Sequence, residues 1–540
     1  MHIVVDRRPA GVALIDDDGA ETLVPEQGLA AAVAAREAEH PRWVWTDTAQ
    51  WYPPLLAAGV RLERCHDLAL VDALLAGIDG RVPRRDWGRP PAPARGDTLF
   101  DLDQAQDAAP PVSAAHAWQQ QRAAIAAHAE PARLTLLAAA ESAGALTAAE
   151  MRHAGLPWSA AAHDALLTEA LGPRPAPGHR PARLEALAAE VERLLGVHPL
   201  PIDSPPELVK ALRRAGLDVA TTRSAELKQL DHPAIVPLLQ YKTLSRLHTA
   251  NGWNWLDEWV HGGRFRPTFV PGGVVTGRWA SDGGGALQLP KQVRPAVVAD
   301  PGWALVVADA AQLEPRILAA LSGDAAMAHA GAGVDLYAGI VASGAVATRE
   351  HAKVGMLGAM YGGTTGVSAL VLPRLARSFP QAIGYVEAAA RAGERGERVT
   401  TRLGRTSPAP SAAWRDRQDA ASSEGAGEAE GRAARTASRS WGRFTRNFVV
   451  QGTAAEWALA WMAGVRRRLW NPEGGPLTAQ PHLVFFVHDE LIVHCPLDRV
   501  AEVEEALRAA AFDAGRIVFG ATPVSFPVSV AAVQRYSDAK

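Results

Sequence analysis

Two stretches of the sequence place acidic residues directly after strand-like apolar runs. In "LVFFVHDELIVHCP", residues 483–496, two β-prone runs are interrupted by His488, Asp489 and Glu490. In "WALVVADAAQLEPR" an apolar run stops at Asp309. Carboxylates brought together from separate strands repel each other unless a cation lies between them. A single Asp at a strand end is more often a turn or a helix cap, so the prediction depends on the pair.

Hard oxygen ligands without a group of His or Cys suit Mg²⁺ better than zinc, and Mg²⁺ commonly bridges one or two carboxylates to substrate phosphates. The pair therefore predicts a magnesium site and the chemistry of phosphoryl transfer.

A helical pattern in "REHAKVGMLGAMYGG" aligns two cations with an aromatic ring. Arg349, Lys353, Leu357 and Tyr361 recur every four residues, which keeps them on one face of a helix. Such a face could hold a triphosphate with its cations and pack its ring against a base. A solvated surface is the alternative interpretation of this spacing.

The same spacing recurs in "RFTRNFVVQG", where one face carries Arg443, Asn447 and Gln451. Guanidinium and amide groups can bind acceptors in the minor groove of a duplex and along its sugar edges. The polar face of an ordinary helix would explain these residues as well. In "TGRWASDGGGALQLP", Arg278 and Gln288 could approach a nucleic-acid backbone, although glycine-rich loops are common.

Composition excludes several protein classes. The chain has 540 residues, enough for roughly three domains, with 48% apolar and 21% charged residues, as in soluble globular proteins. A net charge of −3 does not by itself indicate a nucleic-acid partner. The cysteines, Cys65 and Cys495, predict neither a disulfide framework nor a zinc site. No apolar run predicts a signal peptide or a membrane span, so a cytoplasmic protein is expected.

The pattern of elements predicts several domains. The first residues alternate strands with an Ala-rich helix, which favours a small α/β domain. Residues 80–112 are rich in Pro and Arg and predict a linker or long loop. A helical pattern follows over about 115–250, and mixed α/β patterns follow after 260. Residues 408–438 are poor in aliphatic side chains, which predicts a mobile insertion.

Taken together and in this order, these segments resemble the family A DNA polymerases, the DNA polymerase I type. "DAAQLEPR" is similar to motif A of that family (DYSQIELR), "REHAKVGMLGAMYG" to motif B and "VHDE" to motif C. The resemblance extends from about residue 130 to the end. It suggests an actinobacterial-looking short form with a degenerate 3′–5′ exonuclease domain and without a 5′ nuclease domain.

The resemblance implies a multi-domain α/β protein with the right-hand polymerase fold of palm, fingers and thumb, preceded by an RNase H-like, exonuclease-type α/β domain. The implied ranges are 1–125 for the exonuclease-like domain, 126–260 for a helical thumb, 261–310 for the first part of the palm, 311–438 for the fingers with the insertion 408–438, and 439–540 for the second part of the palm.

The resemblance also implies roles for individual residues. It implies catalytic roles for Asp309, Asp489, Lys353 and Glu490, and metal ligands at Asp309, Asp489 and the Ala310 carbonyl. The residues implied to bind the nucleotide are Arg349, Lys353, Leu357, Tyr361, Gln312 and Glu314. Those implied to contact DNA are Arg278, Gln288, Arg443, Asn447, Gln451 and His488.

Within that set, Lys353 would donate a proton to the leaving group, Glu314 would exclude a ribose 2′-hydroxyl, and Tyr361 would guard the template-base position. The sequence departs from the family pattern at Leu357, where the family has Phe or Tyr. Gly355 lies in the middle of the expected fingers helix. It costs up to about 1 kcal/mol of helix stability relative to Ala and could loosen the closing movement of that helix. Pro315 is tolerable if it falls in the first turn of the next helix.

The first domain lacks the acidic pattern of an exonuclease. Its first strands contain no DxE, and Trp51 stands where the family has an Asp. We therefore expect no proofreading.

The expected activity is template-directed addition of dNTPs to a primer 3′-hydroxyl by two-metal phosphoryl transfer, in replication or in gap filling during repair. The expected cofactors are two Mg²⁺ ions, with Mn²⁺ as a possible substitute. The expected partners are primer-template DNA and dNTPs, and a monomer that associates with the bacterial nucleoid is expected. The alternatives are a low-fidelity translesion or repair polymerase, a non-catalytic DNA-binding scaffold, and a single-subunit RNA polymerase, which would not need Glu314 as a gate.

Overall fold

The computed structural model describes residues 1–84, 87, 113–333, 335–363, 365–423 and 426–539. Most of the predicted linker, 80–112, lies outside the described residues. The chain forms two compact units. The first comprises residues 1–154, 268–282 and 306–532, and the second comprises residues 155–267, 283–305 and 533–540.

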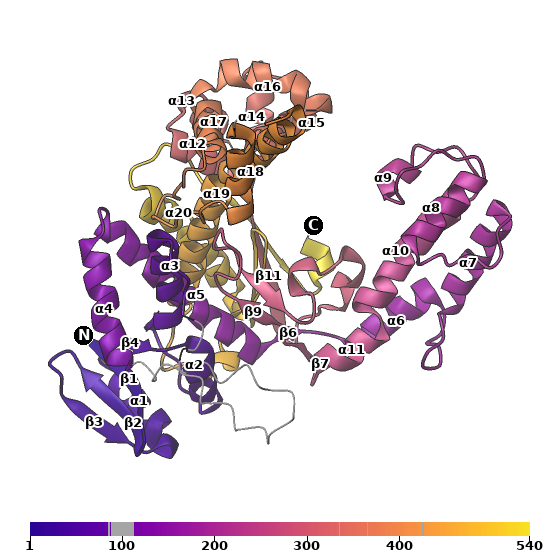
Figure 1. Cartoon of the computed structure of the whole chain (residues 1–540). Helices are drawn as coiled ribbons and strands as arrows, with labels where there is room; N and C mark the ends of the chain where they lie inside the picture. Colours follow the sequence, from indigo (N-terminus) through magenta and orange to yellow (C-terminus); the bar gives the residue numbers. More distant parts are fainter. Residues whose placement is uncertain (85–86, 88–112, 334, 364, 424–425, 540) are drawn as a thin grey trace, which may run out of the picture. The chain divides into compact units, whose positions relative to one another are not determined.

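The N-terminal part of the first unit is the predicted α/β layer (Figure 1). Its mixed sheet has the strand order β3-β2-β1-β4-β5. The strands are β1 (His2–Arg8), β2 (Gly11–Asp16), β3 (Glu21–Val24), β4 (Arg42–Trp45) and β5 (Arg64–Asp67). The helices are α1 (Leu29–Glu37), α2 (Thr48–Ala57), α3 (Leu68–Asp79) and α4 (Ala114–Ala127). Buried Trp43, Trp45 and Tyr52 fill its core, since large aromatic side chains bury the most apolar area.

A second sheet carries both predicted acidic strand ends. Its order is β12-β13-β11-β14, from strands β11 (Trp303–Ala310), β12 (His482–Val487), β13 (Glu490–Pro496) and β14 (Val528–Val533). Every residue of β12 is buried, because helix α5 (Pro131–Ala154) packs against this strand. The apolar run at 483–487 is therefore continuous instead of alternating. A short hairpin of β9 (Thr268–Val270) and β10 (Ala280–Asp282) also belongs to this unit.

The first unit contains further helices, of which the first and the last named below pack against strands β12 and β13 of this sheet. They are α5 (Pro131–Ala154), α12 (Leu313–Ser322), α13 (Ala325–Ala330), α14 (Leu336–Ala342), α15 (Arg349–Tyr361), α16 (Gly366–Ser378), α17 (Pro380–Glu394), α18 (Ala412–Ser422), α19 (Glu428–Arg468) and α20 (Val500–Phe519). In the described residues no single helix is long and apolar enough to cross a membrane. Only the bent pair α15 and α16, at 86° to each other, meets the length and composition criteria together.

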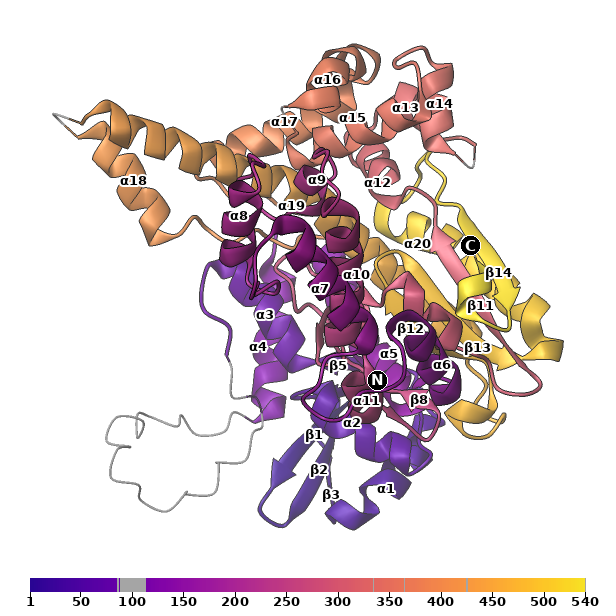
Figure 2. The same cartoon turned by 90° about the vertical axis from the view of Figure 1, so that its right-hand side faces the viewer.

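Most of residues 408–438, where a mobile insertion is predicted, form helices. Helix α18 packs beside the first half of α19, as Figure 2 shows, while residues 424–425 lie outside the described residues. The segment is rich in Ala, Arg and Glu, which form helices well, and its charges lie on exposed faces, as in the ion pair of Arg432 with Glu428 one turn away. The predicted boundary at 438/439 consequently falls inside α19.

The second unit is mainly helical, as the pattern over 115–250 predicts. Its helices are α6 (Ala160–Leu171), α7 (Ala182–Leu195), α8 (Pro205–Arg214), α9 (Ser224–Leu227), α10 (Ile235–Asn251) and α11 (Trp253–Trp259). Three short strands, β6 (Leu156–Pro157), β7 (Val260–His261) and β8 (Arg264–Phe265), form a small sheet in the order β6-β8-β7. The unit begins at residue 155, and not at 126, because α5 packs against α2, β5 and α19 of the first unit.

A buried ionic network connects the N-terminal layer to α19 within the first unit. The Glu150 carboxylate accepts hydrogen bonds from Tyr52 Oη at 2.7 Å, Arg61 Nε at 3.1 Å and Arg466 Nε at 2.9 Å. Burial opposes ionisation of this carboxylate, but Arg466 and Arg61 outweigh it and lower the pKa of Glu150 to about 2. The carboxylate is therefore charged at neutral pH and compensates the buried Arg466.

We predict that Glu150→Gln lowers the free energy of unfolding of the first unit by about 3–5 kcal/mol, because the buried Arg466 guanidinium loses its counter-ion. The midpoint of urea-induced unfolding, followed by tryptophan fluorescence, measures the change. Glu428→Gln is the matched control, since this exposed partner of Arg432 contributes little to stability. Equal midpoints for the two variants would contradict the assigned role of the network.

Candidate functional site

A two-residue hairpin turn presents Asp489 at one end of the second sheet. Val487 of β12 pairs with Glu490 of β13, which leaves His488 and Asp489 as the turn. His488 has a φ of 54°, as the first position of such tight hairpins requires. The end of β11 lies against this turn, because the Ala310 N–H donates to the Asp489 carbonyl at 2.9 Å. The structure therefore brings Asp309 and Asp489 to neighbouring backbone positions, as the sequence predicts.

The two carboxylates influence each other electrostatically. Burial raises the pKa of Asp489 to about 6; Arg278 opposes this shift, whereas the negative charges of Glu314 and Asp309 add to it. Three carboxylates thus share one region with one guanidinium, and excess negative charge of this kind favours a bound cation.

The oxygen ligands at this site fit a cation whose coordination the protein provides only in part. Among the described residues, no group of three or more His, Cys, Asp or Glu side chains is arranged to hold a metal ion. Two carboxylates and a backbone carbonyl are too few for a cation bound by protein alone. They match the usual environment of Mg²⁺, which combines one or two carboxylates with water and substrate phosphates. Glu490 is buried in β13, next to the turn.

Glu314 is held between two donors at the start of α12. Tyr361 Oη donates to one carboxylate oxygen at 2.7 Å and Arg278 Nη2 donates to the other at 2.5 Å. Burial and the Glu314 charge raise the pKa of the Tyr361 hydroxyl, so this group stays protonated and donates. Pro315 falls in the first turn of α12, as expected. Both oxygens of Glu314 are therefore fixed in position.

Gln312 precedes α12 and has a left-handed conformation with a φ of 46°. Its side-chain oxygen accepts a hydrogen bond from the Leu336 N–H at 3.1 Å, at the start of α14. In this structure Gln312 therefore connects two helices.

The predicted stripe on α15 is the outward face of that helix. Arg349, Lys353 and Tyr361 are exposed and Leu357 is half-buried, whereas the opposite face, with Met356 and Met360, is buried. Arg349 Nε donates to Asp335 Oδ2 at 2.7 Å. In the described part of the chain, Lys353 has no ion-pair partner within 4 Å. The Lys353 ammonium is thus accessible to an anion.

The glycines of α15 allow α16 to approach closely. A Cβ atom on Gly355 would lie 2.6 Å from both Leu375 Cδ1 and Val371 Cγ2, and one on Gly358 would lie 2.6 Å from Ser368 Oγ. Real Cβ contacts are not this short, so a larger residue would force these neighbouring side chains or the helices to shift. Close packing therefore favours glycine at position 355, which the sequence interpretation did not anticipate.

The polar face of α19 lies beside the end of α15. Arg443 packs on Gly362, where a Cβ atom would lie 2.7 Å from Arg443 Cγ. The Asn447 Oδ1 atom is buried and accepts no hydrogen bond from the described residues, and Gln451 is half-buried. Arg446, which the sequence interpretation missed, donates to the Ala359 carbonyl at 3.0 Å and so joins α19 to α15.

A second pair that was missed supports the loop of Arg278. Arg405 forms an ion pair with the buried Glu141, and its guanidinium packs so closely on Gly277 that a Cβ atom there would lie 2.5 Å from Arg405 Nε. These residues are far apart in sequence and follow no periodic pattern, so no local signal could have identified them.

Two predicted DNA contacts are exposed. His488 is exposed in the hairpin turn. Gln288 is exposed on a short 3₁₀ turn, Ala286–Gln288, and this turn belongs to the second unit.

In the N-terminal layer, the acidic residue of β1 is already neutralised. Arg8 Nη1 donates to Asp6 Oδ2 at 2.7 Å, and Ser113 Oγ donates to the same oxygen at 2.7 Å. Trp51 is buried in α2, where its Nε1 donates to Thr46 Oγ1 at 3.0 Å.

Comparisons with known proteins extend these observations. The family model for DNA polymerase family A matches residues 179–533. A thermostable DNA polymerase I from Thermus filiformis is 27% identical over 387 residues, which cover 64% of this chain and 42% of that protein. DNA polymerase I from Chloroflexus aurantiacus is 28% identical over 337 residues, which cover 57% of this chain and 33% of that protein. The matches thus span less than half the length of these relatives.

A solved structure has a similar fold. It is the POL domain of Pol1 from M. smegmatis, in a complex with DNA primer-template and dNTP. The TM-score is 0.70 at 22% sequence identity, and the match covers 100% of this chain and 96% of that chain. This likeness supports the predicted multi-domain polymerase fold. The family model matches well over half of the sequence, and the matched range contains the three motifs around Asp309, Lys353 and Asp489. The chain therefore belongs to DNA polymerase family A.

Proposed function

We propose that this chain is a template-directed DNA polymerase, which adds deoxynucleotides to the 3′-hydroxyl of a primer. The observation that carries the proposal is the hydrogen bond from the Ala310 N–H to the Asp489 carbonyl, which keeps the ends of β11 and of the β12–β13 hairpin together. Two carboxylates at this junction, beside an outward cationic helix face, are the groups that phosphoryl transfer requires.

Asp309 and Asp489 would hold two divalent cations, Mg²⁺ or Mn²⁺, with the Ala310 carbonyl as a further ligand and Glu490 in support. Cations at this site would lower the pKa of the primer hydroxyl and neutralise charge on the triphosphate and on pyrophosphate. The protein itself would supply the negative charge that binds them and the rigid strand ends that set their positions.

Residues of α15 would bind the incoming nucleotide. The exposed Lys353 is accessible to a phosphate oxygen and can donate a proton to the departing pyrophosphate. Arg349 would exchange its exposed bond to Asp335 for a phosphate, a small loss because exposed ion pairs contribute little. Leu357 would lie beneath the sugar, Tyr361 would guard the template-base position, and Gln312 would support the nucleotide site through α14.

Glu314 would select deoxynucleotides. Because Tyr361 and Arg278 hold both of its oxygens, the carboxylate cannot turn away when a 2′-hydroxyl approaches. A ribonucleotide would meet both steric contact and an acceptor that is already satisfied.

The proposed contacts to DNA come from four places in the fold. Arg443, Asn447 and Gln451 would contact the minor groove from α19. Arg278, Gln288 and His488 would contact the primer and template from their loops.

We assign the palm to 261–310 and 439–540, the fingers to 311–438 and the thumb to 126–260, with α5 grouped structurally with the first unit. Residues 1–125 would form an exonuclease-like domain without proofreading, because Asp6 is neutralised by Arg8 and Trp51 occupies an acidic position. A role for a monomer in replication or gap repair, including a low-fidelity form of it, is compatible with this assignment.

We predict that Asp489→Ala reduces primer extension by about 1000-fold or more, which corresponds to several kcal/mol of lost transition-state stabilisation. Binding to primer-template DNA should change only a few-fold, because phosphate contacts supply most of the affinity. Asp498→Ala, in the 3₁₀ turn Leu497–Arg499 that follows β13, is the matched control and should extend primers normally. A variant at 489 that retains activity would refute the proposed site, and a wild-type protein that binds DNA but never extends it would support a non-catalytic scaffold.

A second prediction concerns sugar selection. Glu314→Ala should raise the efficiency of rNTP relative to dNTP incorporation by at least 10-fold in single-nucleotide extension with Mg²⁺, since the excluded volume disappears. Tyr361→Phe removes only the hydrogen bond that orients the carboxylate and should cause a smaller rise. Equal use of rNTP and dNTP by the wild-type protein would instead favour an RNA polymerase.

Proofreading is tested with primers that carry a labelled, mismatched 3′ nucleotide. We expect no release of this nucleotide in the presence of Mg²⁺ or Mn²⁺ and without dNTPs. Shortening of the primer at a rate that Asp6→Asn abolishes would contradict the proposal. Efficient extension of the mismatch once dNTPs are added would favour the translesion or repair role.

A further inference from the structure

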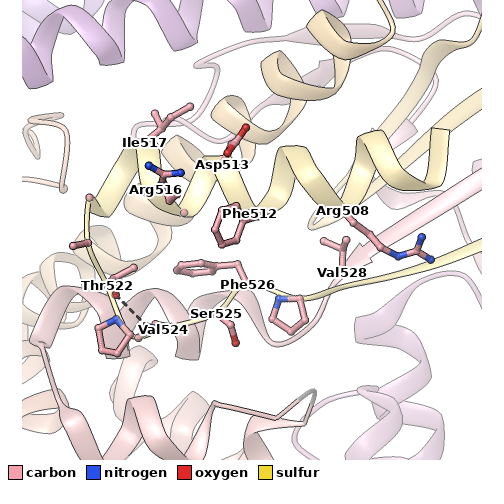
Figure 3. A pocket seen from close by; sticks show the side chains of 15 residues that line it. Arg508, Phe512, Asp513, Arg516, Ile517, Thr522, Val524, Ser525, Phe526 and Val528 are labelled. Atoms are coloured by element: carbon pink, nitrogen blue, oxygen red, sulfur yellow. Dashed lines mark hydrogen bonds between the residues drawn. The ribbon is translucent and has the colours of Figure 1, made fainter. Parts of the chain in front are cut away.

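A groove outside the proposed polymerase site runs along the C-terminal half of α20. It has a volume of about 1070 Å³ and lies between α20 and the segment 520–528, which we call the strap (Figure 3). Side chains of α20 form one wall, and Val524, Phe526 and Val528 contribute to the other. The groove is slightly larger than most small-molecule pockets and is mostly apolar.

The α20 wall carries an aromatic ring between two cations. Arg508, Phe512 and Arg516 are spaced at i, i+4 and i+8, which places them on one face of the helix. Phe512 is 65% exposed and the nearby Ile517 is 44% exposed. The Arg516 guanidinium carbon lies 5.9 Å from the centre of the Phe512 ring. A large, exposed apolar patch with a polar rim is typical of an interaction site.

The charge of this wall is positive. Asp513, the acidic residue of the groove lining, already accepts a hydrogen bond from Arg468 at 2.5 Å. Arg508 pairs with Glu504 at 3.1 Å, one turn away, in an exposed ion pair of little strength. The described residues provide no acidic partner within 4 Å of Arg516. The groove is therefore complementary to a ligand with negative charge.

The opposite wall is fixed to the core of the first unit. The Pro527 carbonyl accepts from the Ala311 N–H at 3.1 Å, and the Ser525 carbonyl accepts from Arg316 Nη1 at 3.0 Å. The Phe526 ring stacks on Phe519 at 5.6 Å between ring centres, with an angle of 8°. The groove is thus formed before any ligand binds, which reduces the entropy lost on binding.

We propose that this groove binds an extended peptide segment of a partner protein, in which an apolar side chain lies between two carboxylates. Eight residues of helix separate Arg508 from Arg516 by about 12 Å. An extended peptide covers this distance in about four residues, and its residues i, i+2 and i+4 face the same side. The matching motif has Asp or Glu at its first and fifth positions and a Phe, Leu or Ile at its third, facing Phe512.

Single-stranded nucleic acid fits the groove less well. A base could stack on Phe512, but binding of a phosphate backbone relies on a continuous cationic track. Here the wall opposite the two arginines consists mainly of Val, Pro and Phe side chains. Apolar contacts on both walls favour a peptide.

The test begins with selection of a random peptide library, displayed on phage, against the full chain. We expect the recovered peptides to share the acidic–x–apolar–x–acidic pattern. A recovered peptide, synthesised with a fluorescein label, should bind in anisotropy measurements, and both Phe512→Ala and Arg516→Glu should weaken its binding at least 10-fold. Leu370→Ala, which removes an equally exposed apolar side chain from α16, is the matched control and should leave binding unchanged.

Thermal unfolding and primer extension of each variant verify that it is folded. A charge reversal on both partners tests the proposal in the opposite direction. The Arg508→Glu, Arg516→Glu double variant should bind a peptide with Lys at its first and fifth positions more tightly than it binds the original acidic peptide. The proposal is overturned if no peptide is enriched, if enriched peptides lack the pattern, or if they bind the two variants as tightly as the wild type. It is also overturned if the variants lose affinity for labelled oligo-dT instead of the peptide.

Discussion

The proposed chemistry depends on one backbone contact, the hydrogen bond between the Ala310 N–H and the Asp489 carbonyl. It joins the end of β11 to a turn between β12 and β13 that lies about 180 residues further along the chain. Two carboxylates are thereby held close together; burial is the main cause of the raised pKa of Asp489, and the charges of Glu314 and Asp309 add to it. Buried strands on both sides of this contact provide the stability that keeps the charges together.

Helix α19 links the regions that surround this contact within the first unit. Its Arg446 pairs with Glu387 of α17, its buried Glu456 accepts hydrogen bonds from the Thr401 hydroxyl and the Leu403 N–H, and its Arg466 pairs with Glu150 of α5. Burial raises the pKa of Glu456 to about 7, whereas the hydrogen bonds from Thr401 and Leu403 and the charge of Arg405 oppose this shift. Helix α19 has 41 residues and is therefore about 60 Å long. Because its backbone hydrogen bonds make it stiff, it holds groups from distant parts of the chain in fixed positions.

The two faces of α15 differ: one packs closely against a neighbouring helix, and the other carries accessible charge. Its inner face contains Gly355 and Gly358, which bring α16 into contact, and its outer face carries Lys353 and Tyr361. A helix that is tightly packed on one side and polar on the other can move together with its neighbour as one body. This property suits the nucleotide-binding role that we propose for α15, and it gives a physical reason for a glycine that would otherwise only destabilise the helix.

The sequence by itself determined the local features: the helix from Arg349 to Tyr361 with its outward stripe, the tight turn at His488 and Asp489, Pro315 in a first helical turn, and the family to which the motifs belong. These features depend on near neighbours in the chain, through periodicity and turn geometry. It did not indicate the helices within 408–438, because a charged sequence poor in aliphatic residues is typical of a solvated helix as well as of a mobile segment. Only the tertiary structure decided that Tyr361 and Arg278 hold Glu314, that Arg405 pairs with Glu141, and that α20 and the strap enclose a groove, since these contacts join residues that no short-range pattern connects.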